Sequence, residues 1–113
     1  MANIDAICEK IMKLGSKQKL SALLKYASDD EEIVRAATAK ALGQIKSYES
    51  GTALIPLLRD SSPRVRAAAA TSAADIGAQH CEEYVKKLAF ADSDTEVRAV
   101  AKDAFDRLKT RLV

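Results

Sequence analysis

Three neighbouring residues, His80, Cys81 and Glu82, carry side chains that can ligate metals or react as nucleophiles. A thiol at a helix start beside an imidazole loses its proton more easily, which is how nucleophilic cysteines are activated. His80 is the only histidine, however, and the trio has neither the spacing of a tetrahedral zinc site nor a third group that would orient the pair. We therefore expect His80 and Cys81 to be structural, and we predict no catalytic, metal or cofactor site.

The rest of the sequence offers no other catalytic pattern. It has no glycine-rich phosphate loop, no Ser–His–Asp set and no metal-chelating carboxylate cluster, and the acidic run 29–32 is typical of a helix start. The cysteines Cys8 and Cys81 are far apart, which favours free thiols over a disulfide framework. These observations predict a protein that is not an enzyme.

The composition favours one small, close-packed domain or a short repeat array. Of the 113 residues, 48% are apolar but only 4% are aromatic, so the apolar share is mostly alanine and aliphatic residues. The net charge of +2 is too small to indicate by itself a nucleic-acid or membrane surface. Neither a secretory signal nor a run of about 20 apolar residues is visible, so we expect a cytoplasmic protein with no membrane partner.

One pattern recurs three times, and the valine of each Val-Arg pair serves as its origin. The valines are Val34, Val65 and Val97, spaced 31 and then 32 residues apart. Each copy has an aspartate five residues before the valine, an arginine one residue after it and Ile or Leu eleven residues after it. A period of 20–50 residues indicates stacked supersecondary units, each of which buries its apolar side against its neighbours.

The apolar spacing predicts an all-helical protein, because no window shows the alternation of a strand. A first helix is expected over 4–14, with Asn3 as its N-cap and Gly15 as its end, and Ser16 is expected to cap a second helix. The remaining helices are expected just before each of the three valines, over 51–58 and over 81–90.

Winding each repeat helix at 100° per residue separates a core side from an outward side. The valine and the positions three, four, seven, eight and eleven later should face the core, and those two, five, six and nine later should face outward. Small outward residues either reflect alanine's helix propensity or form a smooth groove for a partner helix or peptide. With this division, a charge at Ala70 should cost little stability. The candidate partner-binding residues are Ala36, Lys40, Ala67, Ala70, Thr71, Ala74, Ala99 and Asp103.

The arginine after each valine lies in the first turn of a helix, where the positive end of the macrodipole disfavours a cation. We expect the aspartate six residues earlier, from the same unit and from the neighbouring one, to offset this and to form a ladder along the stack. Its value should lie in fixing the turns through hydrogen bonds to the backbone rather than in Coulomb energy. The ladder residues are Asp29, Arg35, Asp60, Arg66, Asp92 and Arg98.

This Asp, Val-Arg, alanine-rich pattern resembles HEAT repeats, specifically the short bacterial kind found in phycobilisome lyase subunits, and the resemblance covers about residues 16–109. It implies an α-solenoid of about three helical hairpins with the second helices on the concave face. Residues 1–15 would then be an N-terminal capping helix, and 16–46, 47–78 and 79–113 the three repeats of a single domain.

A repeat array without catalytic residues favours a non-enzymatic scaffold that binds a protein partner, of unknown identity, on the concave face of the second helices. The resemblance leaves open an accessory subunit of a phycobilin-lyase complex. A nucleic-acid-binding HEAT protein fits less well, because Lys40 and Lys102 are offset by Asp103 and Asp106. Homo-oligomer formation through the exposed ends of the array is a further prediction.

Overall fold

The computed structural model describes residues 3–110, and within that range it contains helices and no strands. The all-α fold predicted from the sequence is confirmed. The elements are α1 (Ile4–Ser16), α2 (Leu20–Leu24), α3 (Glu32–Leu42), α4 (Tyr48–Leu58), α5 (Pro63–Asp75), the 3-10 turn η1 (Gln79–Cys81), α6 (Glu82–Ala91) and α7 (Thr95–Thr110).

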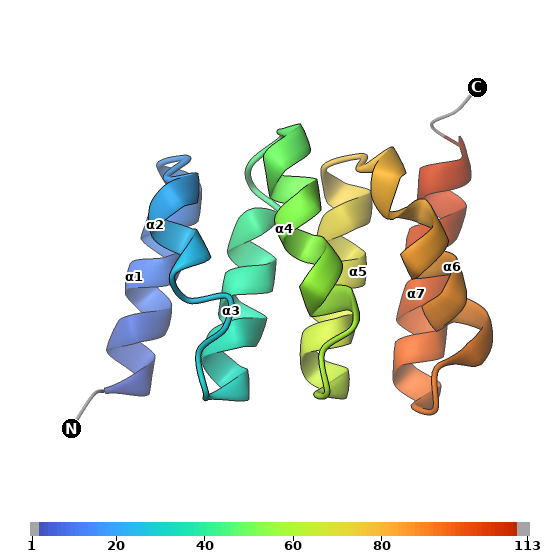
Figure 1. Ribbon diagram of the computed structural model, residues 1–113, viewed down its shortest axis with the longest axis horizontal. Coiled ribbons are helices and arrows are strands. Elements are labelled where there is room, and N and C mark those ends of the chain that lie inside the picture. The colour runs from blue at the N-terminus through green and yellow to red at the C-terminus, as the bar shows by residue number, and fades with distance from the viewer. Residues whose placement is uncertain (1–2, 111–113) are drawn as a thin grey trace.

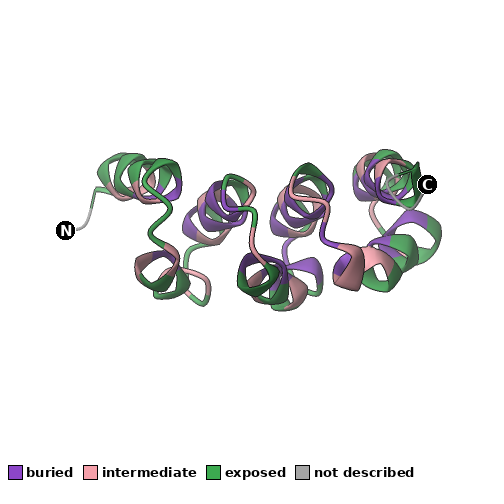
Figure 2. Ribbon diagram, turned by 90° about the horizontal axis from the view of Figure 1, so that it is seen from above, coloured by how far each residue is buried: buried purple, intermediate pink, exposed green. Residues whose placement is uncertain are grey.

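The helices form two layers, which Figure 1 shows face-on and Figure 2 shows from above. In one layer α1, α3, α5 and α7 stand side by side, each packed on the next. In the other layer lie α2, α4 and α6, and each pairs with the helix that follows it in the chain. The result is an elongated α-solenoid of 43 × 28 × 16 Å.

The core lies between the layers and between neighbouring helices of the α1–α7 layer. The three valines that begin the repeats, Val34, Val65 and Val97, are at most 1% exposed. Two buried hydroxyls donate to backbone carbonyls: Ser50 Oγ to Leu42 O (2.7 Å), and Ser72 Oγ on α5 to Ala39 O on α3 (2.6 Å). Such bonds offset the cost of burying a hydroxyl. The buried Ser62 Oγ, by contrast, has no hydrogen-bond partner among residues 3–110.

Gly15 does not end the first helix, contrary to the prediction. Helix α1 continues to Ser16, and the left-handed residue that follows it is Gln18, with φ of 60°. Gly15 is buried against α3, where an added Cβ would lie 2.9 Å from both the Cβ and the carbonyl oxygen of Ala41. The glycine therefore permits close approach of two helices.

Two further helices begin elsewhere than predicted. Helix α4 begins at Tyr48 rather than at residue 51, because the Ser47 side chain caps it by accepting the N–H of Ser50. Helix α2 begins at Leu20 without a side-chain cap, whereas Ser16, its predicted cap, belongs to α1. Side-chain capping thus accounts for the start of α4 but not for that of α2.

Candidate functional site

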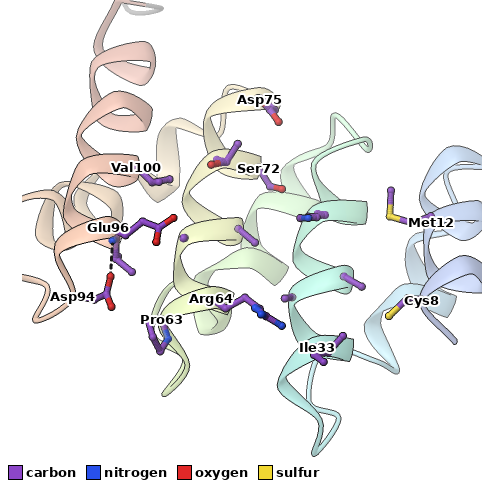
Figure 3. Close-up of a pocket in the computed structure, with 17 residues that line it drawn as sticks. Cys8, Met12, Ile33, Pro63, Arg64, Ser72, Asp75, Asp94, Glu96 and Val100 are labelled. Carbon is purple, nitrogen blue, oxygen red and sulfur yellow. Dashed lines mark hydrogen bonds between the residues drawn. The ribbon is translucent and has the colours of Figure 1, made fainter. Parts of the chain in front are cut away.

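A groove of about 1100 Å³ crosses the face of the α1–α7 layer, and all four helices of that layer line it. Figure 3 shows Cys8 and Met12 on α1 at one side and Val100 on α7 at the other. Helices α3 and α5 lie between these walls. Their residues two and three positions after the valines form the floor: Ala36, Ala37, Ala67 and Ala68.

Half of the predicted partner-binding residues line this groove. They are Ala36, Lys40, Ala67 and Thr71. Ala99 and Asp103 are exposed on α7 but do not line it, and Ala70 and Ala74 are buried. Conversely, five residues expected in the core line the groove: Ala37, Ala68, Ser72, Val97 and Val100.

The predicted outward orientation of Ala70 and Ala74 is wrong, since both are 0% exposed. The wheel assumed one buried side for each helix. Helix α5, however, packs on α3 on one side, on α7 on the other and on α4 in the second layer. The positions five and nine after the valine therefore face the next helix of the same layer. On α3 and α5, the side that no other described helix covers is the side that lines the groove.

Charged side chains at the groove come from three helices. In Figure 3 Arg64 reaches from α5 towards α3, and Glu96 reaches from α7 towards α5. Within residues 3–110, neither of these nor Lys40 forms an ion pair. Asp75 does, because Arg107 Nη2 lies 2.7 Å from its Oδ1. Among residues 3–110, the charges that line the groove without an ion pair are thus two cations near its middle, Lys40 and Arg64, and two anions at its α7 end, Glu96 and the helix cap Asp94.

At the corners between the layers, Arg35 and Arg66 form the same set of hydrogen bonds. Arg35 Nε and Nη2 donate to the two carboxylate oxygens of Asp60 at 2.8 and 3.0 Å, and Nη1 donates to the carbonyl of Asp29 at 2.8 Å. Arg66 repeats this pattern with the carboxylate of Asp92 and the carbonyl of Asp60. Each arginine thus takes its carboxylate from the following unit and only a carbonyl from its own.

The carboxylates also shape the turns. Oδ1 of each ladder aspartate accepts the N–H two residues later at 2.9 Å, as with Asp60 and Ser62. For Asp92, the hydrogen bond from Arg66 outweighs burial and holds the carboxyl pKa below its usual range. For Asp60, burial raises the pKa, but the bonds from Arg35 and Ser62 together leave it lowered.

The last ladder arginine, Arg98, has a different environment. Its Nη1 donates to Asp92 O at 2.6 Å and its Nη2 to Thr95 Oγ1 at 3.3 Å. No carboxylate of residues 3–110 forms an ion pair with it. The turn is anchored as in the other units, but the link to a following unit is missing.

Residues 4–60 match the HEAT repeats family, and residues 52–80 match the HEAT repeat. The chain belongs to the HEAT-repeat family. No curated protein matches it. HEAT repeats are generally protein-interaction scaffolds.

The region that matches the HEAT family begins with α1. In the structure, α1 occupies the place in the array that the second helix of a repeat would occupy. Gly15 meets Ala41 of α3 as Gly43 of α3 meets Ser72 of α5. In this register Cys8 and Met12 correspond to Ala36 and Lys40 of α3. Helix α1 therefore continues the groove by one helix although no first helix precedes it among the described residues.

His80 and Cys81 are engaged in packing. The ring of His80 stacks on Tyr48 with centroids 4.1 Å apart, and its Nε2 lies 3.1 Å from the Tyr48 carbonyl, which requires the proton on Nε2. Cys81 is fully buried, and its Sγ lies 3.2 Å from Gly51 O. Burial raises the pKa of Cys81 to about 11, the opposite of what a nucleophile needs.

Within residues 3–110, no three His, Cys, Asp or Glu side chains are grouped so that they could hold a metal ion. No helix in that part of the chain is long and apolar enough to cross a membrane.

Sequence reasoning missed several groove residues, all of them outside the positions that the wheel assigned outward. Arg64 and Glu96 precede the valine by one position, and Ile33 holds that position on α3. The wheel was started at the valine, so this position was not considered. The residues of α1 were missed because that helix lacks the Val-Arg pair.

Proposed function

We propose that this protein is a non-enzymatic scaffold that binds a helix or peptide segment of a protein partner in the groove across α1, α3, α5 and α7. The observation that carries the proposal is the groove's floor of small alanine side chains on α3 and α5, between bulkier side chains that line the rest of the groove. Membership of the HEAT-repeat family supports it, because such repeats generally serve as interaction scaffolds.

The borders of the groove support the same role. Met12 on α1 and Ile33 on α3 are 41% and 42% exposed. When a partner covers exposed apolar side chains, the complex is stabilised by about 25 cal/mol per Å² of apolar surface removed from water. The adjacent free charges provide the polar rim that specific interfaces have.

The test is a bulky substitution that fills the groove, made at a residue that does not pack in the core. Thr71 is exposed and lines the groove, so Thr71→Trp places an indole above the floor without altering buried packing. A partner captured from cell extract by the wild type should be retained at least about tenfold less by this variant.

Lys102→Trp is the matched control. Lys102 is exposed on α7 and does not line the groove, so this variant should retain the partner as the wild type does. Unchanged retention by Thr71→Trp, with an unchanged circular dichroism spectrum, would refute the proposal. Equal loss with both variants would refute it as well, because the groove would then not be the contact.

A further inference from the structure

Two rows of side chains border the alanine floor, one on each side. The first consists of the residues just before the valines, Ile33, Arg64 and Glu96 on α3, α5 and α7. The second, six residues after the valines, consists of Lys40 and Thr71, preceded on α1 by the corresponding Met12. Both rows run across the helices, so they follow the long axis of the array.

The separation of these rows matches the thickness of one α-helix. Within each helix the two rows are seven residues, or two turns, apart, which is about 10 Å at 1.5 Å per residue. A helix with its side chains is about 10–12 Å across. Neighbouring helix axes lie about 8–10 Å apart, so the floor from α3 to α7 accommodates about 13 residues of helix.

The groove suits a helix better than an extended strand. Its lining comes from helices whose backbone groups are bonded internally, so an extended peptide would find few groups to pair with its own N–H and C=O. A helix brings its backbone groups already paired. The alanines Ala36, Ala37, Ala67 and Ala68 provide no bulk that would prevent close packing of its side chains.

Charge gives the groove a direction. Along the first row the residues change from apolar Ile33 to cationic Arg64 to anionic Glu96. Along the second row they change from apolar Met12 on α1 through cationic Lys40 on α3 to neutral Thr71 on α5. Taken together, the two rows present apolar residues on α1 and α3, cations on α3 and α5, and an anion on α7. A segment whose charges are complementary to this order along its length can pair with the groove. A segment with the reverse order would bring like charges together.

We infer that the groove receives a single amphipathic helix that lies along the array, across α1 to α7. The helix places apolar side chains against α1 and α3, acidic side chains near Lys40 and Arg64, and basic side chains near Glu96. This inference rests on the proposed function and specifies the partner's chemistry.

The test uses synthetic helical peptides of about 18 residues with capped ends, a length that spans about 27 Å. All have the same composition and the same Ala/Leu face. In one pair glutamates occupy the middle and lysines one end, with the lysine end N-terminal in one peptide and C-terminal in the other. In a second pair the lysines and glutamates are exchanged. Binding is measured by fluorescence polarisation at low salt.

The wild type should bind the better glutamate-middle peptide about three- to tenfold more tightly than either exchanged peptide, as expected for a few partly exposed charge pairs. The double variant Arg64→Glu/Glu96→Arg should abolish this preference, because Lys40 then offsets the new glutamate. The control double variant Glu83→Lys/Lys86→Glu makes an equivalent exchange on α6, in the other layer, and should keep the wild-type preference.

Each contrary result is informative. Equal binding of both charge orders by the wild type, or a preference that persists in the groove double variant, would overturn the inference. Failure of all four peptides to bind, while a captured partner remains sensitive to Thr71→Trp, would overturn the helical occupant and leave the groove function standing. Loss of that sensitivity would instead refute the proposed function. If the wild type binds a DNA duplex but none of the peptides, and Thr71→Trp abolishes the binding of DNA, the groove is assigned to nucleic acid and the inference is overturned.

Discussion

Helices α5 and α7 are copies of one repeat, but they use the same two positions in opposite ways. Five and nine residues after the valine, α5 has Ala70 and Ala74, which are fully buried, and α7 has Lys102 and Asp106, which are exposed. A neighbour in the layer covers that side of α5, whereas no described helix covers that side of α7. Burial in this protein is therefore decided by place in the stack as well as by place on the helix.

The ladder shows the same contrast between inside and end. Arg66 binds a carboxylate of the next unit with two hydrogen bonds, and Arg98 has no such carboxylate among residues 3–110. Their own turns are anchored alike, through Nη1 to the carbonyl of the aspartate six residues earlier. What differs is the contact between units, so paired substitutions at equivalent positions can isolate it.

The largest effect is expected from Ala70→Glu compared with Lys102→Glu, at the same repeat position. Ala70→Glu buries a carboxylate in a site with no room and no partner, and should lower the free energy of unfolding by more than about 4 kcal/mol or prevent folding. Lys102→Glu should change it by less than about 0.5 kcal/mol. Urea denaturation followed by circular dichroism measures both, and similar values would disprove the contrast.

A second comparison uses the position nine after the valine. An added Cβ on Gly43 would lie 2.5 Å from Ser72 Oγ and 2.9 Å from its Cβ, so Gly43→Ala forces α3 and α5 apart. We expect a loss of about 1–3 kcal/mol although alanine is the better helix former. Asp106→Ala, at the equivalent exposed site, should be neutral or slightly stabilising. Thermal unfolding of both variants is the measurement. A stabilised Gly43→Ala variant would show that the interface between α3 and α5 can accommodate an added methyl group.

The ladder comparison is expected to be smaller. Arg66→Ala removes two charge-assisted bonds to Asp92 and should cost about 1–3 kcal/mol more than Arg98→Ala, which removes bonds only within its own unit. Chemical denaturation at neutral pH gives the difference. Equal losses would mean that the ladder acts on the turns alone.

The pH dependence separates the carboxylate contribution of that ladder contact. The pKa of Asp92 is lowered in the folded protein from 3.8, so its contribution is present above about pH 4 and is lost as the pH falls through the folded value. Wild type should therefore lose more stability than Arg66→Ala between pH 5 and pH 2, measured as urea midpoints. Parallel profiles would contradict the role of Arg66 in lowering that pKa.

The thiols give a contrast with no expected cost in stability. Cys81 lies inside the array with its pKa raised to about 11, whereas Cys8 lies half-buried at the groove on α1. Ellman's reagent should modify one thiol of the native protein readily and the second only after denaturation. Bound helical peptide should slow the first reaction, and Cys8→Ser should abolish it. Rapid modification of two thiols in the native protein would contradict the burial of Cys81.

Much of the fold could be predicted because the repeat is written in residues with direct structural roles. The Val-Arg pairs marked the starts of α3, α5 and α7, and the recurring period indicated stacking. The boundary at Gly15 could not be predicted, since a glycine that ends a helix and one that admits a neighbouring helix look alike in sequence. Only the tertiary contact with Ala41 distinguishes them.

The candidate site was predicted in part for a related reason. A single helical wheel identified Lys40, Ala67 and Thr71 correctly as lying outside the core, but it could not show that a second helix covers Ala70. One signal was available: the positions five and nine after the valine are small in two copies and charged in the third. That contrast distinguishes covered from uncovered sides of otherwise equivalent helices.

Asp60 takes part in both neighbouring units at once. Its carboxylate binds Arg35 of the unit before, its Oδ1 shapes its own turn, and its carbonyl accepts from Arg66, which in turn binds the unit after. Each of these contacts joins a unit only to an adjacent unit, so folding cooperativity must be transmitted from each unit to its neighbour. Opening of the array should then proceed from its ends, and amide hydrogen exchange should be slowest in α5, whose corner is tied on both sides.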